Sequence, residues 1–254
     1  MDQDDIPQIH DVPAALGLLS RLPVSVDEAR ATARGARAAW AYPVAGLLLA
    51  LIAGGVAQIA LWLGLPASLS AGLTLASLII MTGAMHEDGL ADSADGLWGG
   101  WTLTRRLEIM KDSHIGVYGV IAVALGIGLR WQALTLIFAA GLVWPALIVV
   151  ACLSRAVMVP VMARLPHARS TGLSHAVGRP SQNTALISLG IAALLAVILW
   201  QGVGIWLLML AALATLICAI IAKRKIGGQT GDILGATQQI TEITLLLAIA
   251  ARLS

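Results

Sequence analysis

Three aspartates, Asp88, Asp92 and Asp95, directly follow a long apolar run in the segment HEDGLADSADGLWGG, residues 86–100. Their spacing of i, i+4 and i+7 places the three carboxylates on one face of a helix. Like charges at this spacing repel one another unless a cation lies among them, and Mg2+ takes carboxylate oxygens and commonly bridges to substrate phosphates. The alternative is a solvated acidic helix end that caps a membrane span. The glycines and apolar residues between the aspartates favour the metal site.

A segment of mixed charge comes next. On a helix, Arg105, Glu108 and Asp112 share a face at i, i+3 and i+7. Such a face is either a surface with weak ion pairs or part of a phosphate and metal site, and the sequence leaves both open. In the second interpretation Asp112 serves the metal or the chemistry, and cationic side chains bind phosphate oxygens. The candidates for phosphate are Arg105, Arg106 and Lys111.

Two later loops add candidate contacts for an anionic ligand. Residues 164–179 are basic and contain no acid, which suits an anionic ligand or the head groups of anionic lipids. Residues 223–232, KRKIGGQTGD, form a glycine-rich turn before a helix, where unpaired backbone N–H groups can hold phosphate. The candidates in this turn are Gly228, Thr230 and Gly231.

Asp232 closes the third loop and has two interpretations. It is either the N-cap of the last helix or a metal ligand. A polar stripe on one face of that helix, at i, i+3, i+7 and i+10, favours the site, because such a stripe must face protein or a wet cavity and not lipid. The stripe consists of Asp232, Gly235, Gln239 and Glu242.

The elements that position these residues are membrane helices. The chain is 58% hydrophobic and 12% charged, with a mean hydropathy of +0.86, whereas a soluble domain carries about a quarter charged residues. Runs near the roughly 20 residues that cross a bilayer recur along the chain. We therefore predict an all-α, polytopic membrane bundle of six to seven helices, forming a single domain over residues 1–254 with an N-terminal segment, 1–37, at the membrane surface. The expected spans are Trp40–Leu63, Ser68–Met85, Ile115–Leu129, Ala133–Met162 (interrupted by Pro145), Ala185–Trp200, Val203–Ala222 and Ile233–Leu253.

Charge is distributed on alternate loops. Positive residues cluster before the first span and after the second, fourth and sixth, while the intervening turns carry only Arg130, which we expect at the bilayer edge. By the positive-inside rule the charged loops face the cytoplasm. Every acid beyond residue 40 also falls on this side. We therefore expect an active site at the cytoplasmic face, because a transporter would place ionisable groups near mid-membrane.

Three ordered motifs resemble the cobalamin synthase (adenosylcobinamide-GDP ribazoletransferase) family. They are His86–Gly96, Arg106–Gly116 and the segment 228–236, and the similarity extends over most of the chain. Two positions depart from the family pattern. Glu87 replaces an apolar residue, and we expect it either to retune the metal site or to face water. His114 stands where arginine is common, which puts a phosphate contact at that position in doubt.

The resemblance implies a membrane transferase in the bacterial inner membrane. Its substrates would be adenosylcobinamide-GDP and alpha-ribazole or alpha-ribazole 5'-phosphate, its cofactor Mg2+, and its products GMP and adenosylcobalamin or the 5'-phosphate. A lipid bilayer but no nucleic acid is expected as a partner, and a homo-oligomer is left open. In this scheme Asp88, Asp92, Asp95 and Asp232 hold metal, and Asp88, Asp92 and Asp112 are the catalytic candidates.

Two other classes remain as alternatives. A CDP-alcohol phosphotransferase also moves a phosphate ester with aspartates on membrane helices, but its pattern needs a later Gly-x-x-x-Asp-x-x-x-Asp, whereas Asp92 is followed by Ser-Ala-Asp-Gly-Leu-Trp. A corrinoid or ion transporter is third, and the low charge of the spans argues against it.

Overall fold

The computed structural model describes residues 6–253, which fold into helices joined by short turns. Within this range the β pairing is limited to an isolated bridge between His167 and Gln229. The first five residues of the expected N-terminal segment, and Ser254, lie outside the described range. The helices are α1 (Asp11–Leu19), α2 (Glu28–Arg34), the 3-10 helix η2 (Gly35–Ala41), α3 (Tyr42–Trp62), α4 (Ala67–Thr82), α5 (Met85–Gly99), α6 (Leu103–Ile109), α7 (Val117–Ala139), α8 (Val143–Ala156), α9 (Met158–Arg164), α10 (Leu173–Val177), α11 (Gln182–Trp200), α12 (Gly202–Ile226) and α13 (Gly231–Ala250).

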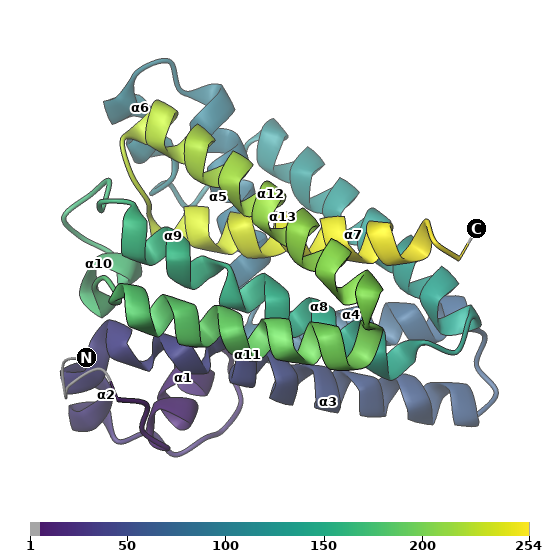
Figure 1. Cartoon of the computed structure of the whole chain (residues 1–254). Helices are drawn as coiled ribbons and strands as arrows, with labels where there is room; N and C mark the ends of the chain where they lie inside the picture. The colour runs from purple at the N-terminus through teal and green to yellow at the C-terminus, as the bar shows by residue number, and fades with distance from the viewer. Residues whose placement is uncertain (1–5, 254) are drawn as a thin grey trace.

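The predicted polytopic bundle is confirmed. Six stretches of helix in the described range are long and apolar enough to span a bilayer, and a seventh span is formed if the bent pair α4–α5 is included. These six stretches contain α3, α7, α8 with α9, α11, α12 and α13. Successive spans run in opposite directions and connect the two ends of the bundle (Figure 1). We call the end that carries α1, α2, α5, α6 and α10 the site end; it lies to the left in Figure 1, opposite the C-terminus.

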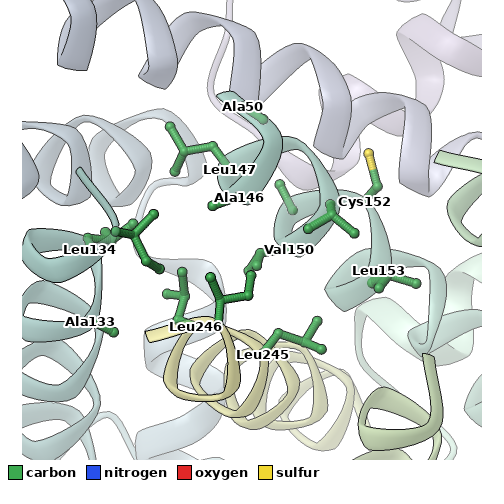
Figure 2. Close-up of a cluster of buried hydrophobic side chains, with 14 of the residues drawn as sticks. Ala50, Ala133, Leu134, Ala146, Leu147, Val150, Cys152, Leu153, Leu245 and Leu246 are labelled. Carbon is green, nitrogen blue, oxygen red and sulfur yellow. The ribbon is translucent and has the colours of Figure 1, made fainter. Parts of the chain in front are cut away.

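Helices α8 and α13 form the centre of the bundle. About 83% of the α8–α9 span and 78% of the α13 span are buried, compared with 22% of α12 and 28% of α7 and α11, whose remaining surface is available to lipid. Small residues allow close approach at the centre, as is usual where lipid offers no hydrophobic driving force. Figure 2 shows Val150 of α8 next to Leu245 and Leu246 of α13, with Ala50 on the opposite side of α8.

Helix α5 leaves the direction of the spans at a sharp bend. α4 ends at Gly83, which has a left-handed φ of 62°, and Ala84 follows with a φ of 56°. Glycine is the common residue for such a helix end because it lacks a Cβ. The bend between α4 and α5 is 84°. We therefore treat α4 as the span and α5 as a helix that lies across the site end, outside the spanning segments.

One predicted span boundary is wrong. We expected a turn near Arg130–Gln132, but α7 continues to Ala139 and the turn comes at 140–142. Arg130 therefore lies inside a span, 2% exposed, and not at the bilayer edge. Acidic partners from other helices neutralise it, as described below. Pro145 does not interrupt a span, because it lies in the first turn of α8, where a missing backbone N–H costs nothing.

Candidate active site

The site is built where α5 crosses α13, and the crossing requires two glycines. A Cβ on Gly89 would lie 2.9 Å from the carbonyl oxygen of Asp232 and 3.1 Å from Cα of Gly235. A Cβ on Gly235 would lie 3.3 Å from Cα of Gly89. The two backbones are therefore in contact, and any larger residue would separate them. This contact brings Asp88 and Asp92 of α5 next to Asp232 of α13.

The three carboxylates are close enough to perturb one another. Burial, followed by the nearby charges of Asp88, Asp232 and Asp95, raises the pKa of Asp92 to about 7, and only Arg169 acts in the opposite direction. Asp88 is exposed, whereas Asp92 and Asp232 are half-buried, so the cluster opens to the surface at Asp88. An excess of negative charge held in this way attracts a cation.

Arg169 is the cation that the structure places in the cluster. Its Nη2 donates to Oδ2 of Asp232 over 3.0 Å, with both side chains less than one-fifth exposed. Its Nη1 is buried and has no hydrogen-bond partner among the described residues. A guanidinium with one free donor beside a carboxylate cluster can bind a phosphate oxygen. Arg169 was not among the predicted site residues; the sequence signals for it were an acid-free basic loop and the similarity of the loop around Arg169–Leu173 to the family.

The glycine-rich turn before α13 acts by holding the Arg169 loop. The backbone N–H of Gln229 donates to Pro166 O over 2.8 Å, and the N–H of Ala168 donates to Gln229 O over 2.9 Å. The Gln229 side chain accepts a 2.6 Å bond from the Ser174 hydroxyl and lies 2.9 Å from Nδ1 of His167. Segments far apart in sequence are thus joined, which sets the position of Arg169.

The predicted phosphate contacts of this turn have different surroundings. A Cβ on Gly228 would collide with the carbonyl of Pro166, so this glycine is needed for packing between the loops. Thr230 is buried and is the N-cap of α13, since its hydroxyl accepts from the N–H of Ile233 over 3.3 Å. The N-cap interpretation of Asp232 is therefore wrong, and its carboxylate accepts the Thr230 hydroxyl over 3.1 Å as well as Arg169. Gly231 borders the cavity described below.

Asp95 faces α7 and not the centre of the cluster. Its two carboxylate oxygens accept the backbone N–H groups of Gly116 and Gly119 over 2.7 and 2.9 Å. A carboxylate at the N-terminus of a helix is stabilised by the unpaired N–H groups and the helix dipole. Asp95 therefore ties α5 to α7, and its role as a metal ligand stays a prediction.

The candidates of the first loop lie at the surface. Arg105 forms an exposed ion pair with Glu108 at 3.1 Å, as in our alternative of a surface with weak ion pairs. Asp112 is exposed and bonds to His114 at 2.7 Å. Arg106 has a packing role, because it donates to the carbonyls of Gly100 and Lys225 over 3.0 and 2.9 Å. Lys111 is exposed. Asp112, Arg105, Arg106 and Lys111 do not border the cavity.

Glu87 belongs to a buried polar network beneath the site. Its Oε1 accepts from Nη1 of Arg130 over 2.7 Å and from Gln239 over 3.1 Å, and Nη2 of Arg130 lies 2.8 Å from Glu242. Glu87 therefore does not face water, contrary to one of our two expectations, and a retuning of the metal site by Glu87 stays a prediction. The expectation that the stripe with Gln239 and Glu242 faces protein is confirmed, as both residues are buried. The network joins α5, α7 and α13.

A cavity of about 230 Å3 adjoins the carboxylates. Asp88, Asp232 and Arg169 border one side of it, and most of the remaining wall is apolar. The apolar residues come from α1, α5, α9, α10 and α13. The site therefore combines a charged rim with an apolar chamber.

No group of three or more histidine, cysteine or acidic side chains in residues 6–253 is placed to hold a metal by itself. Mg2+ does not need such a cage, since it is commonly bound by one or two carboxylates, water and substrate phosphates. One or two of the carboxylates of Asp88, Asp92 and Asp232 supply hard oxygen donors that fit this mode of binding.

Fold and site together define a polytopic helical membrane enzyme with a carboxylate cluster at one end of the bundle. The family model for cobalamin-5-phosphate synthase matches residues 11–250, and the chain belongs to this family. It is thus a membrane transferase of cobalamin biosynthesis.

Curated relatives cover almost the whole chain. The adenosylcobinamide-GDP ribazoletransferase of Bradyrhizobium diazoefficiens is 47% identical over 244 residues, covering 96% of this chain and 94% of the relative. That of Sinorhizobium medicae is 41% identical, covering 94% and 95%, and that of Mesorhizobium japonicum is 40% identical, covering 97% and 95%. No solved structure matches the chain.

Proposed function

We propose that this chain joins adenosylcobinamide-GDP to alpha-ribazole or alpha-ribazole 5'-phosphate and releases GMP. A ribose hydroxyl of the acceptor attacks the phosphorus nearer the corrinoid, and the bond from that phosphorus to the bridging oxygen breaks. The hydroxyl proton passes to a carboxylate, and GMP leaves with the bridging oxygen. The product is adenosylcobalamin or its 5'-phosphate. The observation that carries the proposal is the backbone contact of Gly89 with Gly235, which gathers Asp88, Asp92 and Asp232 beside Arg169.

Asp88, Asp92 and Asp232 are proposed to hold Mg2+ against the donor diphosphate. A bound Mg2+ would neutralise charge on the diphosphate and orient its oxygens for transfer. The geometry supports this assignment through the shared negative charge of the three carboxylates and through the exposure of Asp88, from which the donor can reach them. We propose that Asp88 or Asp92 also accepts the hydroxyl proton, since both lie in the cluster, whereas Asp112 is engaged with His114 at the surface.

Arg169 is proposed to bind the transferred phosphate. Asp232 orients the guanidinium through the 3.0 Å contact, and the unpaired Nη1 remains available as a donor. A positioned donor of this kind stabilises charge that develops on phosphate oxygens during transfer. The exposed Arg105 and Lys111 are proposed to contact the GMP portion at the surface.

The site end is proposed to face the cytoplasm of a bacterial inner membrane. The support is charge: the segments at the site end carry nearly all lysine and arginine residues, whereas the turns at the opposite end are short and apolar.

The test is GMP release from adenosylcobinamide-GDP by the purified full-length protein in detergent with alpha-ribazole and Mg2+. We expect Asp88→Ala and Asp92→Ala each to reduce turnover by about a hundredfold or more, the loss typical of removing a transition-state contact. Asp27→Ala is the matched control, because Asp27 forms an exposed ion pair with Arg30 at 3.2 Å, and it should retain activity. Full activity in either site variant, or no GMP from the wild-type protein, would refute the proposal.

A further inference from the structure

The wall of the cavity of about 230 Å3 beside the carboxylates is mostly apolar, and neither a metal ion nor a phosphate needs such a wall. Three methionines line it from two helices, namely Met85 of α5 and Met158 and Met162 of α9. Leucine and valine side chains of α1 and α10, Tyr42 of α3 and Leu234 of α13 add to the wall. Methionine is flexible and polarisable, and it adapts well to flat aromatic ligands. The chamber is therefore suited to an apolar, planar group.

The volume of the cavity is too small for the largest part of the substrates, which is the corrin ring. Pockets that enclose drug-sized ligands measure roughly 300–1,000 Å3, and a corrin ring with its amide side arms is larger than such ligands. A chamber of about 230 Å3 accepts a fragment of about two fused rings. The corrinoid must therefore remain outside the chamber.

The two bases that remain are the guanine of the donor and the benzimidazole of alpha-ribazole, and they differ in polarity. Guanine carries donors and acceptors around its edge, and burying them without partners is costly. Apart from the charged Asp88, Asp232 and Arg169, the polar side chains at the wall are Tyr42, His86 and Ser174, and the Ser174 hydroxyl already donates to Gln229. A benzimidazole has a single free ring nitrogen once its other nitrogen bears ribose. His86 and Tyr42 also border the chamber, and one polar side chain is enough to satisfy such an atom.

The covalent structure of the acceptor also favours a position of its base in the chamber. The attacking hydroxyl belongs to the ribose that carries the base, so the base must lie one sugar away from the reacting phosphorus. Asp88, Asp232 and Arg169 border the chamber itself, which gives this separation. We propose that the chamber is the subsite for the apolar bicyclic base of the acceptor nucleoside. This assignment rests on the proposed function and adds the residues that select the acceptor.

Val177 of α10 offers a direct test, because it is half-buried and borders the chamber. In full-length protein, Val177→Phe should raise KM for an alpha-riboside of dimethylbenzimidazole by about tenfold or more, as expected when bulk is added to a tight apolar pocket. KM for an alpha-riboside of single-ring imidazole should change much less, and KM for adenosylcobinamide-GDP should not change. Leu173→Trp, at an exposed position on the same helix, gives a second variant if the first does not fold.

Val197→Phe is the matched control, since Val197 lies on α11, is 42% exposed and does not border the chamber. A rise in the KM of the donor instead of the acceptor would assign the chamber to guanine and overturn the proposal. Unchanged KM values for both substrates in both chamber variants would show that the chamber holds only lipid or detergent, and would also overturn it. Absence of GMP from the wild-type protein would refute the proposed function itself, and the two failures are thereby distinguishable.

Discussion

At the scale of residues, the role of each aspartate in the site depends on the groups that surround it. Asp92 lies among three other carboxylates, and burial and these charges raise its pKa to about 7. Asp95 has the same spacing pattern on α5 but is occupied by two backbone N–H groups of the α7 terminus. Helical spacing predicted that both would share a face, and only the folded chain distinguishes the two roles.

Arg169 provides a prediction at this scale. Arg169→Lys keeps the positive charge but loses the planar guanidinium. In the wild-type protein its Nη2 contacts Asp232, while its Nη1 has no partner among the described residues. We expect kcat/KM for GMP release to fall by about tenfold or more. Arg30→Lys, in an exposed pair with Asp27, is the control and should behave as wild type. Equal activity of the two variants would argue against a phosphate contact at Arg169.

At the scale of elements, the contact between α5 and α13 determines whether the carboxylates meet. Gly89→Ala would place a Cβ 2.9 Å from the backbone oxygen of Asp232, and backbone cannot rotate away as a side chain can. We expect a loss of about 1–3 kcal/mol in the free energy of unfolding and a fall in turnover of about a hundredfold, because small displacements of reacting groups are costly.

Gly190 supplies the matched control for this contact. A Cβ at Gly190 of α11 would meet no atom within 4 Å, and alanine is the better helix former. Gly190→Ala should therefore leave turnover unchanged and stability equal or slightly higher. Thermal unfolding in detergent and GMP release measure both quantities. Wild-type activity in Gly89→Ala would contradict the importance of the crossing.

The polar network beneath the site gives a second prediction for the elements. Arg130→Met leaves Glu87 and Glu242 buried without their cation, and removing one partner of a buried ion pair costs about 3–5 kcal/mol. Glu87→Gln keeps an acceptor for Arg130 and retains the pair with Glu242, so its cost should be smaller. Unfolding free energies in detergent would test this order. Losses that are small in both variants would show that the network contributes little.

At the scale of the whole molecule, most spans could be predicted from the sequence, because a run of apolar residues is a local signal. The exception was the end of α7. Arg130 suggested a bilayer edge, whereas its partners Glu87 and Gln239 are 43 and 109 residues away. Arg169 was missed for the same reason, since Asp232 is 63 residues away. Contacts across long sequence separations have no local pattern, and they define both the site and the interior of the bundle.

Because seven is an odd number of spans, we expect the two described ends of the chain to lie on opposite sides of the membrane. In a variant with Cys152 and Cys218 replaced by alanine, a cysteine at Ser113, in the site-end loop before α7, should react with a membrane-impermeant thiol reagent only from the cytoplasm. A cysteine at Arg252, after α13, should react only from outside. Labelling of both positions from one side would contradict the seven-span arrangement.

The dependence of GMP release on Mg2+ tests the central claim most directly. After exhaustive chelation, the wild-type protein should release no GMP, and added Mg2+ should restore full turnover. In Asp232→Asn, which keeps the shape of the side chain but removes its charge, the Mg2+ concentration for half-maximal rate should rise by about tenfold or more. Undiminished GMP release after chelation, or an unchanged Mg2+ requirement in Asp232→Asn, would contradict a metal held by α5 and α13.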